Sequence, residues 1–110
     1  MRHVDIYRDA LVRQFFEESE TGLAAMEQAL VTLEESLRDA RSLNTLFRVA
    51  HATRGNSASL GFAELAEVAQ VLEDVLDRLR SGSLVVSRQV IDLLRESVYA
   101  LRALLAEAKQ

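Results

Sequence analysis

The sequence predicts an all-α fold, specifically an antiparallel up-and-down four-helix bundle. The 110 residues include no proline and only four glycines, and 49% of them are apolar. These apolar residues recur every three or four positions, which is the period of a helix and not of a strand. The pattern breaks at three short segments, and long helices joined by short connections pack as antiparallel neighbours. A chain of this length forms one domain around one hydrophobic core.

The first helix is expected to begin near Asp5 and to end before Asp39. Gly22 weakens the helical propensity but does not interrupt the apolar stripe, so the segment is interpreted as a single helix. Ile6 and Ala10 lie off this stripe, so the first two turns either project beyond the bundle with spare apolar surface or fray. The stripe consists of Val12, Phe16, Ser19, Leu23, Met26, Leu30, Leu33 and Leu37.

The second helix is expected to span residues 43–60. Ser42 is a residue type that caps helix N-termini, and Gly61 can adopt the left-handed conformation that ends a helix. The buried face of this helix is predicted to contain Leu43, Leu46, Ala50, Thr53, Ser57 and Leu60.

The third helix is expected to follow at once from Phe62 and to end at Gly82, and Ser87 is the predicted N-cap of the fourth. The apolar face of the third helix contains Phe62, Leu65, Val68, Ala69, Leu72, Val75, Leu76 and Leu79, and that of the fourth Ile91, Leu94, Val98, Leu101 and Leu105.

Composition excludes several classes of function. The net charge is −4 without a basic cluster, which disfavours nucleic acid and anionic membranes as partners. No apolar run approaches the roughly 20 residues of a membrane span. The absence of cysteine excludes disulfides and thiolate metal sites and fits the cytoplasm. With only two histidines and no Glu-x-x-His pair, we expect neither a metal nor a cofactor in the domain, which we expect to be monomeric.

His51 is the candidate reactive residue. It falls well off the buried face of the second helix, and its neighbours Ala52, Gly55 and Ser59 have small side chains or none. Glycine within a helix costs about 1 kcal/mol relative to alanine, so stability does not explain Gly55. Access to the imidazole does explain it. The alternative is an ordinary surface histidine beside a helix irregularity.

Glu73 is the candidate partner of His51. His51 lies ten residues before Gly61 and Glu73 lies twelve residues after it, so antiparallel pairing of the two helices about Gly61 places them side by side. A carboxylate that accepts from Nδ1–H leaves Nε2 with its lone pair outward, as a nucleophilic histidine requires. Arg54, one turn after His51, can screen the charge of a phosphoryl group. The alternative for Glu73 is a solvated flank residue.

Several motifs together resemble the histidine phosphotransfer (HPt) domain, and more narrowly the amino-terminal domain of CheA-type chemotaxis kinases. That family carries His-x-x-Lys-Gly, then Gly-Phe ten residues after the histidine, then a glutamate twenty-two residues after it. Arg54 stands where the family usually has lysine, and Gln70 stands where some relatives have a second histidine. The matching segments are His51-Ala52-Thr53-Arg54-Gly55, Leu60-Gly61-Phe62, Glu73, Phe15-Phe16-Glu17-Glu18 and Met26-Glu27.

The resemblance implies a phosphorelay carrier. His51 would accept a phosphoryl group at Nε2 from an ATP-binding kinase domain, on the same or another chain, with Glu73 holding Nδ1 and Arg54 stabilising charge. CheY-like and CheB-like receivers would then take it on an aspartate. ATP and magnesium would belong to the partner domains, and this domain alone would catalyse nothing. Residues 1–110 would form the amino-terminal domain of a longer cytoplasmic kinase protein, with a fifth helix lost by truncation.

The partner surface is expected to surround His51. Phe47 lies one turn before the histidine, toward either the first or the third helix, and partly exposed aromatic residues anchor transient interfaces. Ala52, Asn56 and Ser59 would complete this surface, which Ile6 and Ala10 could extend. The alternative function is a structural or adaptor bundle that binds proteins without chemistry.

Overall fold

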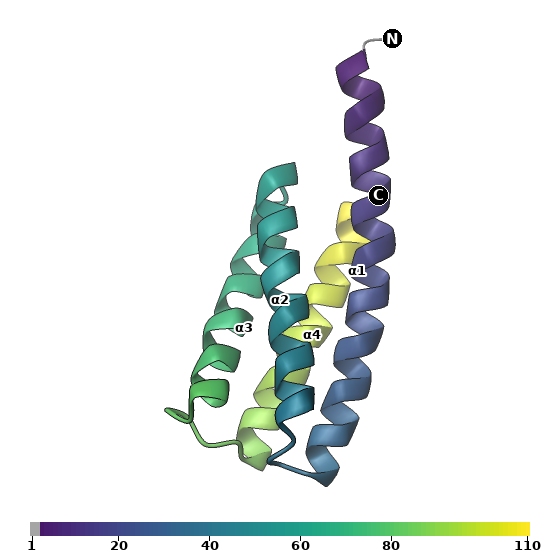
Figure 1. Cartoon of the computed structure of the whole chain (residues 1–110). Helices are drawn as coiled ribbons and strands as arrows, with labels where there is room; N and C mark the ends of the chain where they lie inside the picture. Colours follow the sequence, from purple (N-terminus) through teal and green to yellow (C-terminus); the bar gives the residue numbers. More distant parts are fainter. Residues whose placement is uncertain (1–2) are drawn as a thin grey trace.

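The computed structural model describes residues 3–110, with side chains from Ile6 onward. Within that range the chain forms four helices and no strand: α1 (His3–Glu35), α2 (Ala40–Leu60), α3 (Ala63–Ser81) and α4 (Arg88–Ala108). Each helix packs against two others in the ring α1–α2–α3–α4. The bundle is elongated, about 51 × 21 × 20 Å, with short connections between antiparallel neighbours (Figure 1). The predicted fold class is confirmed.

Two glycines and one serine set helix ends as the sequence predicts. Gly61 ends α2 with φ 86°, and Gly82 ends α3 with φ 83°, the left-handed conformation that glycine adopts without steric cost. Ser87 caps α4, where its side chain accepts a hydrogen bond from the Val90 backbone N–H at 3.2 Å. The corner at Gly61 is therefore tight, and it fixes the register in which α2 and α3 pair.

The start of α2 corrects one expectation. The helix begins at Ala40, not after Ser42, and Asp39 occupies the N-cap position. Ser42 is buried within the first turn, where its hydroxyl donates to the Asp39 carboxylate at 2.6 Å. The residues before Ser42 tolerate helical geometry, so the helix extends one turn further toward its N-terminus.

Two positions of the predicted α1 stripe are also corrected. Leu37 lies beyond the end of α1, in the turn before α2, and is exposed. Phe15 is buried although it lies off the stripe, whereas Phe16 is only partly buried. Both rings pack against Phe62 of the α2–α3 corner, which stacks on Phe15 with centroids 5.4 Å apart and is tilted against Phe16 at 5.8 Å.

The first turns of α1 project beyond the α2–α3 corner as a continuous helix (Figure 1). Of the two expectations for this segment, the structure shows the projecting helix. Arg8 attaches α1 to the corner, because its Nη2 donates to the Leu60 carbonyl at 2.9 Å. Ile6, Tyr7 and Leu11 remain exposed around it. Apolar side chains are therefore exposed at one end of the bundle, and His51 lies nearer to this end than to the other.

Candidate functional site

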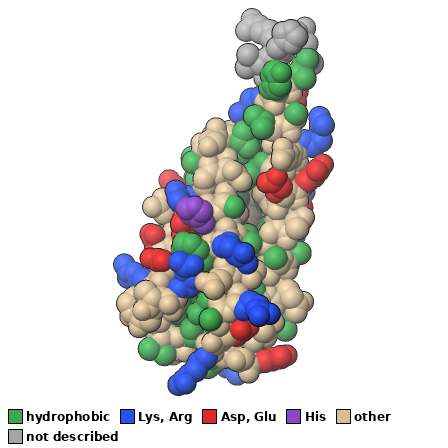
Figure 2. All heavy atoms as spheres, in the orientation of Figure 1, with side chains coloured by type: hydrophobic (Ala, Val, Ile, Leu, Met, Phe, Trp, Pro, Cys, Tyr) green, Lys and Arg blue, Asp and Glu red, His purple; other side chains and the backbone are tan. Residues whose placement is uncertain are grey.

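His51 lies on the open side of α2. Leu46, Ala50 and Ser57 take the buried face of the helix, and the histidine side chain keeps 57% of its surface exposed. Figure 2 shows a histidine side chain, coloured purple, open to solvent on this face of the bundle. A Cβ added at Gly55 would meet no atom within 4 Å, so the space one turn after His51 is open. The structure thus has the clearance that the sequence predicts.

Glu73 meets His51 across the α2–α3 pair. Its Oε2 lies 2.6 Å from His51 Nδ1, and only 13% of its side-chain surface is exposed. An ionised carboxylate can only accept, so Nδ1 carries a proton, and in the neutral imidazole Nε2 then carries the lone pair. The contact predicted by counting from Gly61 is present.

Arg54 lies on the Nδ1 side of the imidazole. Its Nε donates to Glu73 Oε1, and its Nη2 is 3.3 Å from His51 Nδ1. Since Nδ1 already donates to Glu73, this second contact is proximity and not a hydrogen bond. The guanidinium therefore holds the carboxylate from the other oxygen, and its role toward a phosphoryl group stays a prediction.

The pKa of Glu73 is lowered from the ordinary value of 4.5. Burial acts in the opposite direction and raises it, but the hydrogen bonds from Arg54 and His51 together with their charges outweigh burial. A carboxylate with a depressed pKa stabilises the fold above its unfolded-state pKa, and this contribution is lost only as the pH falls through the folded-state value. Glu73 is therefore ionised throughout the neutral range, as a partner for Nδ1–H must be.

Phe47 faces α3, which settles the side that the sequence left open. Its ring lies nearly parallel to the His51 ring, at 13° with centroids 6.0 Å apart. Arg80 of α3 places its guanidinium carbon 3.7 Å from the Phe47 centroid. Arg80 does not stand out in the sequence, because a cation in the last turn of a helix is already explained by the helix dipole.

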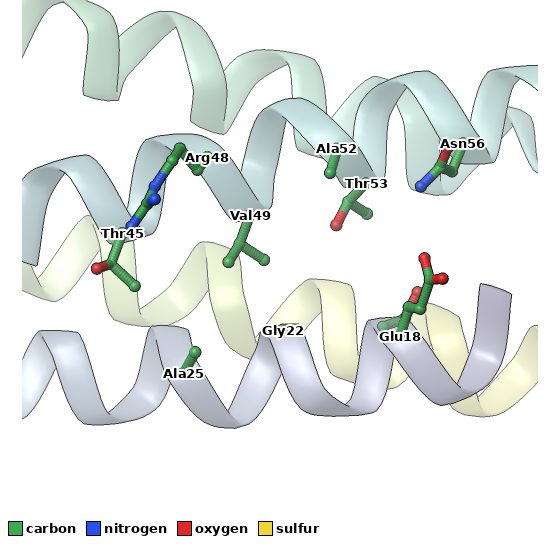
Figure 3. Close-up of a pocket in the computed structure, with 10 residues that line it drawn as sticks. Glu18, Gly22, Ala25, Thr45, Arg48, Val49, Ala52, Thr53 and Asn56 are labelled. Carbon is green, nitrogen blue, oxygen red and sulfur yellow. The ribbon is translucent and has the colours of Figure 1, made fainter. Parts of the chain in front are cut away.

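The other three predicted partner residues lie on the opposite side of α2, toward α1. Ala52 and Asn56 line a cavity of about 360 Å³ between the two helices, which Arg48 and Glu18 border (Figure 3). Asn56 and Ser59 line a neighbouring hollow of about 230 Å³ that reaches Leu11 on α1. The predicted partner surface is thus divided, with Phe47 on the α3 flank of His51 and the other three residues on the α1 flank.

Gly22 has a structural reason that the sequence did not reveal. A Cβ at this position of α1 would lie 2.9 Å from Val49 Cγ1 of α2, which is closer than real Cβ contacts. The glycine therefore lets α1 and α2 approach each other on the floor of the 360 Å³ cavity.

In the part of the chain that the structure describes, no group of three His, Cys, Asp or Glu side chains is placed to hold a metal ion. Within the same residues, none of the helices combines the length and the apolar character needed to cross a membrane.

Comparison with known proteins identifies the family and the fold. The profile of the Hpt domain family matches residues 10–108. The chemotaxis protein CheA of Borreliella burgdorferi is 31% identical over 106 residues, which cover 96% of this chain and 12% of that protein. CheA of Klebsiella aerogenes is 38% identical over 88 residues, covering 80% of this chain and 14% of that protein.

A solved structure shares the fold. The CheA phosphotransferase domain from Thermotoga maritima superposes with a TM-score of 0.84 over the whole of both chains, at 22% identity. The chain spans only 12% and 14% of the length of the two curated relatives named above, so the comparison concerns one domain of those proteins.

Proposed function

The chain belongs to the Hpt domain family, and we propose that it is a phosphorelay carrier in chemotaxis signalling with His51 as the phosphoryl acceptor. One observation carries the proposal. Glu73 occupies Nδ1 at 2.6 Å, while the imidazole remains more than half exposed. This combination prepares Nε2 for in-line attack and leaves room for a partner to deliver phosphate.

The first step is transfer from ATP held by a kinase domain, on the same chain or another. The Nε2 lone pair forms the new N–P bond, the bond between the γ-phosphorus and the bridging oxygen breaks, and ADP leaves with that electron pair. The ring becomes cationic, and Glu73 stabilises it through Nδ1–H. Magnesium and ATP are supplied by the kinase domain, so the chain acts as a substrate and not as an enzyme.

The second step is transfer to a receiver domain. A receiver aspartate oxygen attacks the phosphorus, the N–P bond breaks, and the electron pair returns to Nε2, which restores neutral His51. The positively charged ring is a good leaving group, so the carrier does not need catalytic groups of its own. We propose CheY-like and CheB-like receivers as acceptors, and the cytoplasm as the place of the relay.

An adaptor bundle without chemistry explains less of the geometry. Such a protein needs no partly buried carboxylate behind an exposed histidine and no open space at Gly55. The experiment that separates the two functions is phosphorylation of this chain with γ-labelled ATP and a CheA that lacks its own phosphotransfer domain, followed by addition of a CheY-like receiver. Acid-labile label on the chain, discharged by the receiver, supports the carrier. A chain that is never labelled contradicts it.

We propose that receivers dock on the α1 flank of His51. On the α3 flank, Glu73, Arg54 and the stack of Arg80 on Phe47 fill the surface. On the α1 flank, Ala52, Asn56 and Ser59 line open hollows. Phe47 is therefore a weaker candidate for a partner anchor than the sequence suggests.

The charge of α2 supports an acidic partner. This helix carries Arg41, Arg48 and Arg54 and no acidic residue, although the whole chain has a net charge of −4. Figure 2 shows Lys and Arg side chains near the histidine on this face, with Asp and Glu side chains on one side of it. A receiver site must hold an acceptor aspartate and magnesium-binding carboxylates, so opposite charges meet in the complex.

The docking proposal predicts where a receiver perturbs the spectrum. On titration with a CheY-like receiver, we expect amide chemical-shift changes in residues 47–59 and in the first turns of α1, and few in α4. The surface is small, so binding is expected to be weak, as a carrier that releases its partner requires. Changes concentrated on α4 would refute this docking site and leave the acceptor role of His51 untouched.

Gly55 provides a second test of access. Gly55→Ala should raise the stability of the fold by up to about 1 kcal/mol, because alanine is the better helix former and the added Cβ meets no neighbour. Gly55→Leu should remain folded yet slow transfer from the kinase, since its branched side chain stands one turn from the imidazole. Thermal unfolding and labelling rates measure the two effects. Native transfer rates in the leucine variant would show that access does not explain the glycine.

A further inference from the structure

The Phe47 ring is held between two helices. Arg80 places its guanidinium carbon 3.7 Å from the ring centroid, well within the range of a cation–π interaction. The same guanidinium is tethered twice, because Nη1 donates to Asn44 Oδ1 at 3.3 Å and Nη2 lies 3.5 Å from Asp77 Oδ1. Arg80 is thus fixed from both α2 and α3, and it fixes the aromatic ring beside it.

Phe47 in turn lies against the acceptor imidazole. His51 follows Phe47 by one turn of α2, and Asn44, to which Arg80 is bound, precedes Phe47 by three residues. The order along the surface is therefore Arg80, Phe47, His51. The two rings are nearly parallel, at 13° with centroids 6.0 Å apart.

The parallel Phe47 ring restricts the orientation of the imidazole in a way that Glu73 cannot. One hydrogen bond at Nδ1 fixes the position of that atom but lets the ring pivot about it. The Phe47 ring, parallel to one face of the imidazole, restricts this rotation and sets the direction in which Nε2 points. Transfer of a phosphoryl group requires that direction to be in line with the leaving oxygen, so the Phe47 ring affects the rate of transfer and not only the stability of the fold.

We infer that Arg80 is a positioning residue for the acceptor histidine and acts through Phe47. The inference rests on the proposed function, because it assigns Arg80 a part in the same transfer. Arg80 itself touches neither the imidazole nor the incoming phosphate in this arrangement. Its contribution is the orientation of the ring.

The test compares three variants of the full chain. Arg80→Gln removes the cation, Arg80→Lys keeps a cation able to lie over the ring, and Arg78→Gln removes an equally charged, exposed neighbour on α3. Labelling is measured with γ-labelled ATP and a CheA lacking its phosphotransfer domain. We expect kcat to fall about five-fold in Arg80→Gln with KM unchanged. Arg80→Lys should recover most of the rate, and Arg78→Gln should match the parent.

A second readout does not depend on a partner. NMR of the His51 ring reports its orientation against Phe47 through the ring-current shift. We expect Arg80→Gln to lose part of that shift and Phe47→Leu to lose all of it, while circular dichroism shows both variants folded.

Three outcomes would overturn the inference. Arg80→Gln could retain both kcat and the ring-current shift, Arg78→Gln could show the same loss, or the change could appear in KM alone, which would make Arg80 a docking residue. Failure of the proposed function looks different. In that case the parent chain takes no label from ATP, whatever residue stands at position 80, and the ring-current measurement still decides whether Arg80 orients His51.

Discussion

Replacing His51 with glutamine should abolish phosphoryl uptake from ATP while leaving the bundle folded. The side chain is 57% exposed and contributes nothing to the hydrophobic core. Glutamine can still approach Glu73 but offers no nucleophilic nitrogen in place of Nε2, so no residual transfer is expected. Acid-labile label after incubation with a CheA kinase measures the effect, and circular dichroism measures the fold.

The matched control for this variant is His3→Gln. His3 is the only other histidine in the sequence, and its side chain lies outside those that the structure describes. The His3 variant should be labelled at the rate of the parent chain. Acid-labile phosphate that persists in His51→Gln, or disappears in His3→Gln, would contradict the assignment of the acceptor.

Removing the Glu73 carboxylate should slow transfer about 10- to 100-fold, the range known for losing a carboxylate that orients a metal-binding histidine. Two variants separate its contributions. Glu73→Gln keeps an oxygen that can accept from Nδ1–H but loses the charge that stabilises the cationic ring, and Glu73→Ala loses both. The rate should therefore fall in the order parent, glutamine, alanine.

Stability should change little in these variants. The partner Arg54 is about one third exposed, and an ion pair screened by solvent contributes no more than about 1 kcal/mol. Asp74→Ala, which removes an exposed carboxylate from the next position of α3, is the control and should transfer normally. If Glu73→Ala transferred as fast as Asp74→Ala, Glu73 would be a flank residue without a part in the reaction.

The pairing of His51 with Glu73 could be predicted from the sequence for a physical reason. Glycine in the left-handed conformation makes the corner at Gly61 tight, so residues at similar distances on either side of it must lie level. The buried faces of α2 and α3 then fix the rotation of each helix. Counting residues from the corner is therefore sufficient to predict that the two side chains meet.

Contacts between side chains that do not follow from this register could not be predicted. Whether Phe47 faces α1 or α3 depends on the handedness of the bundle, which helix periodicity does not specify. The stack of Arg80 on Phe47 depends on that choice and on the path of a long, flexible side chain. The burial of Phe15 likewise depends on where the Phe62 ring lies after the corner.

Helix ends were less predictable than helix faces. Ser42 has the right chemistry for a cap, but Asp39 takes that position and α2 starts earlier. Leu37 continues the apolar periodicity of α1, although the helix ends before it, at Glu35. In both cases the local sequence pattern favours one helix end, but the packing of α1 against α2 determines the geometry of the turn between them and therefore where each helix ends.

The most direct test of the central claim is to identify the atom that carries the phosphate. The chain is phosphorylated by a CheA kinase and ATP, and heteronuclear NMR of the imidazole nitrogens locates the N–P bond before a CheY-like receiver is added. The structure predicts phosphate on His51 Nε2, with Nδ1 still bound to Glu73, and its loss when the receiver arrives. Phosphate on Nδ1, or on any other residue, would contradict the account.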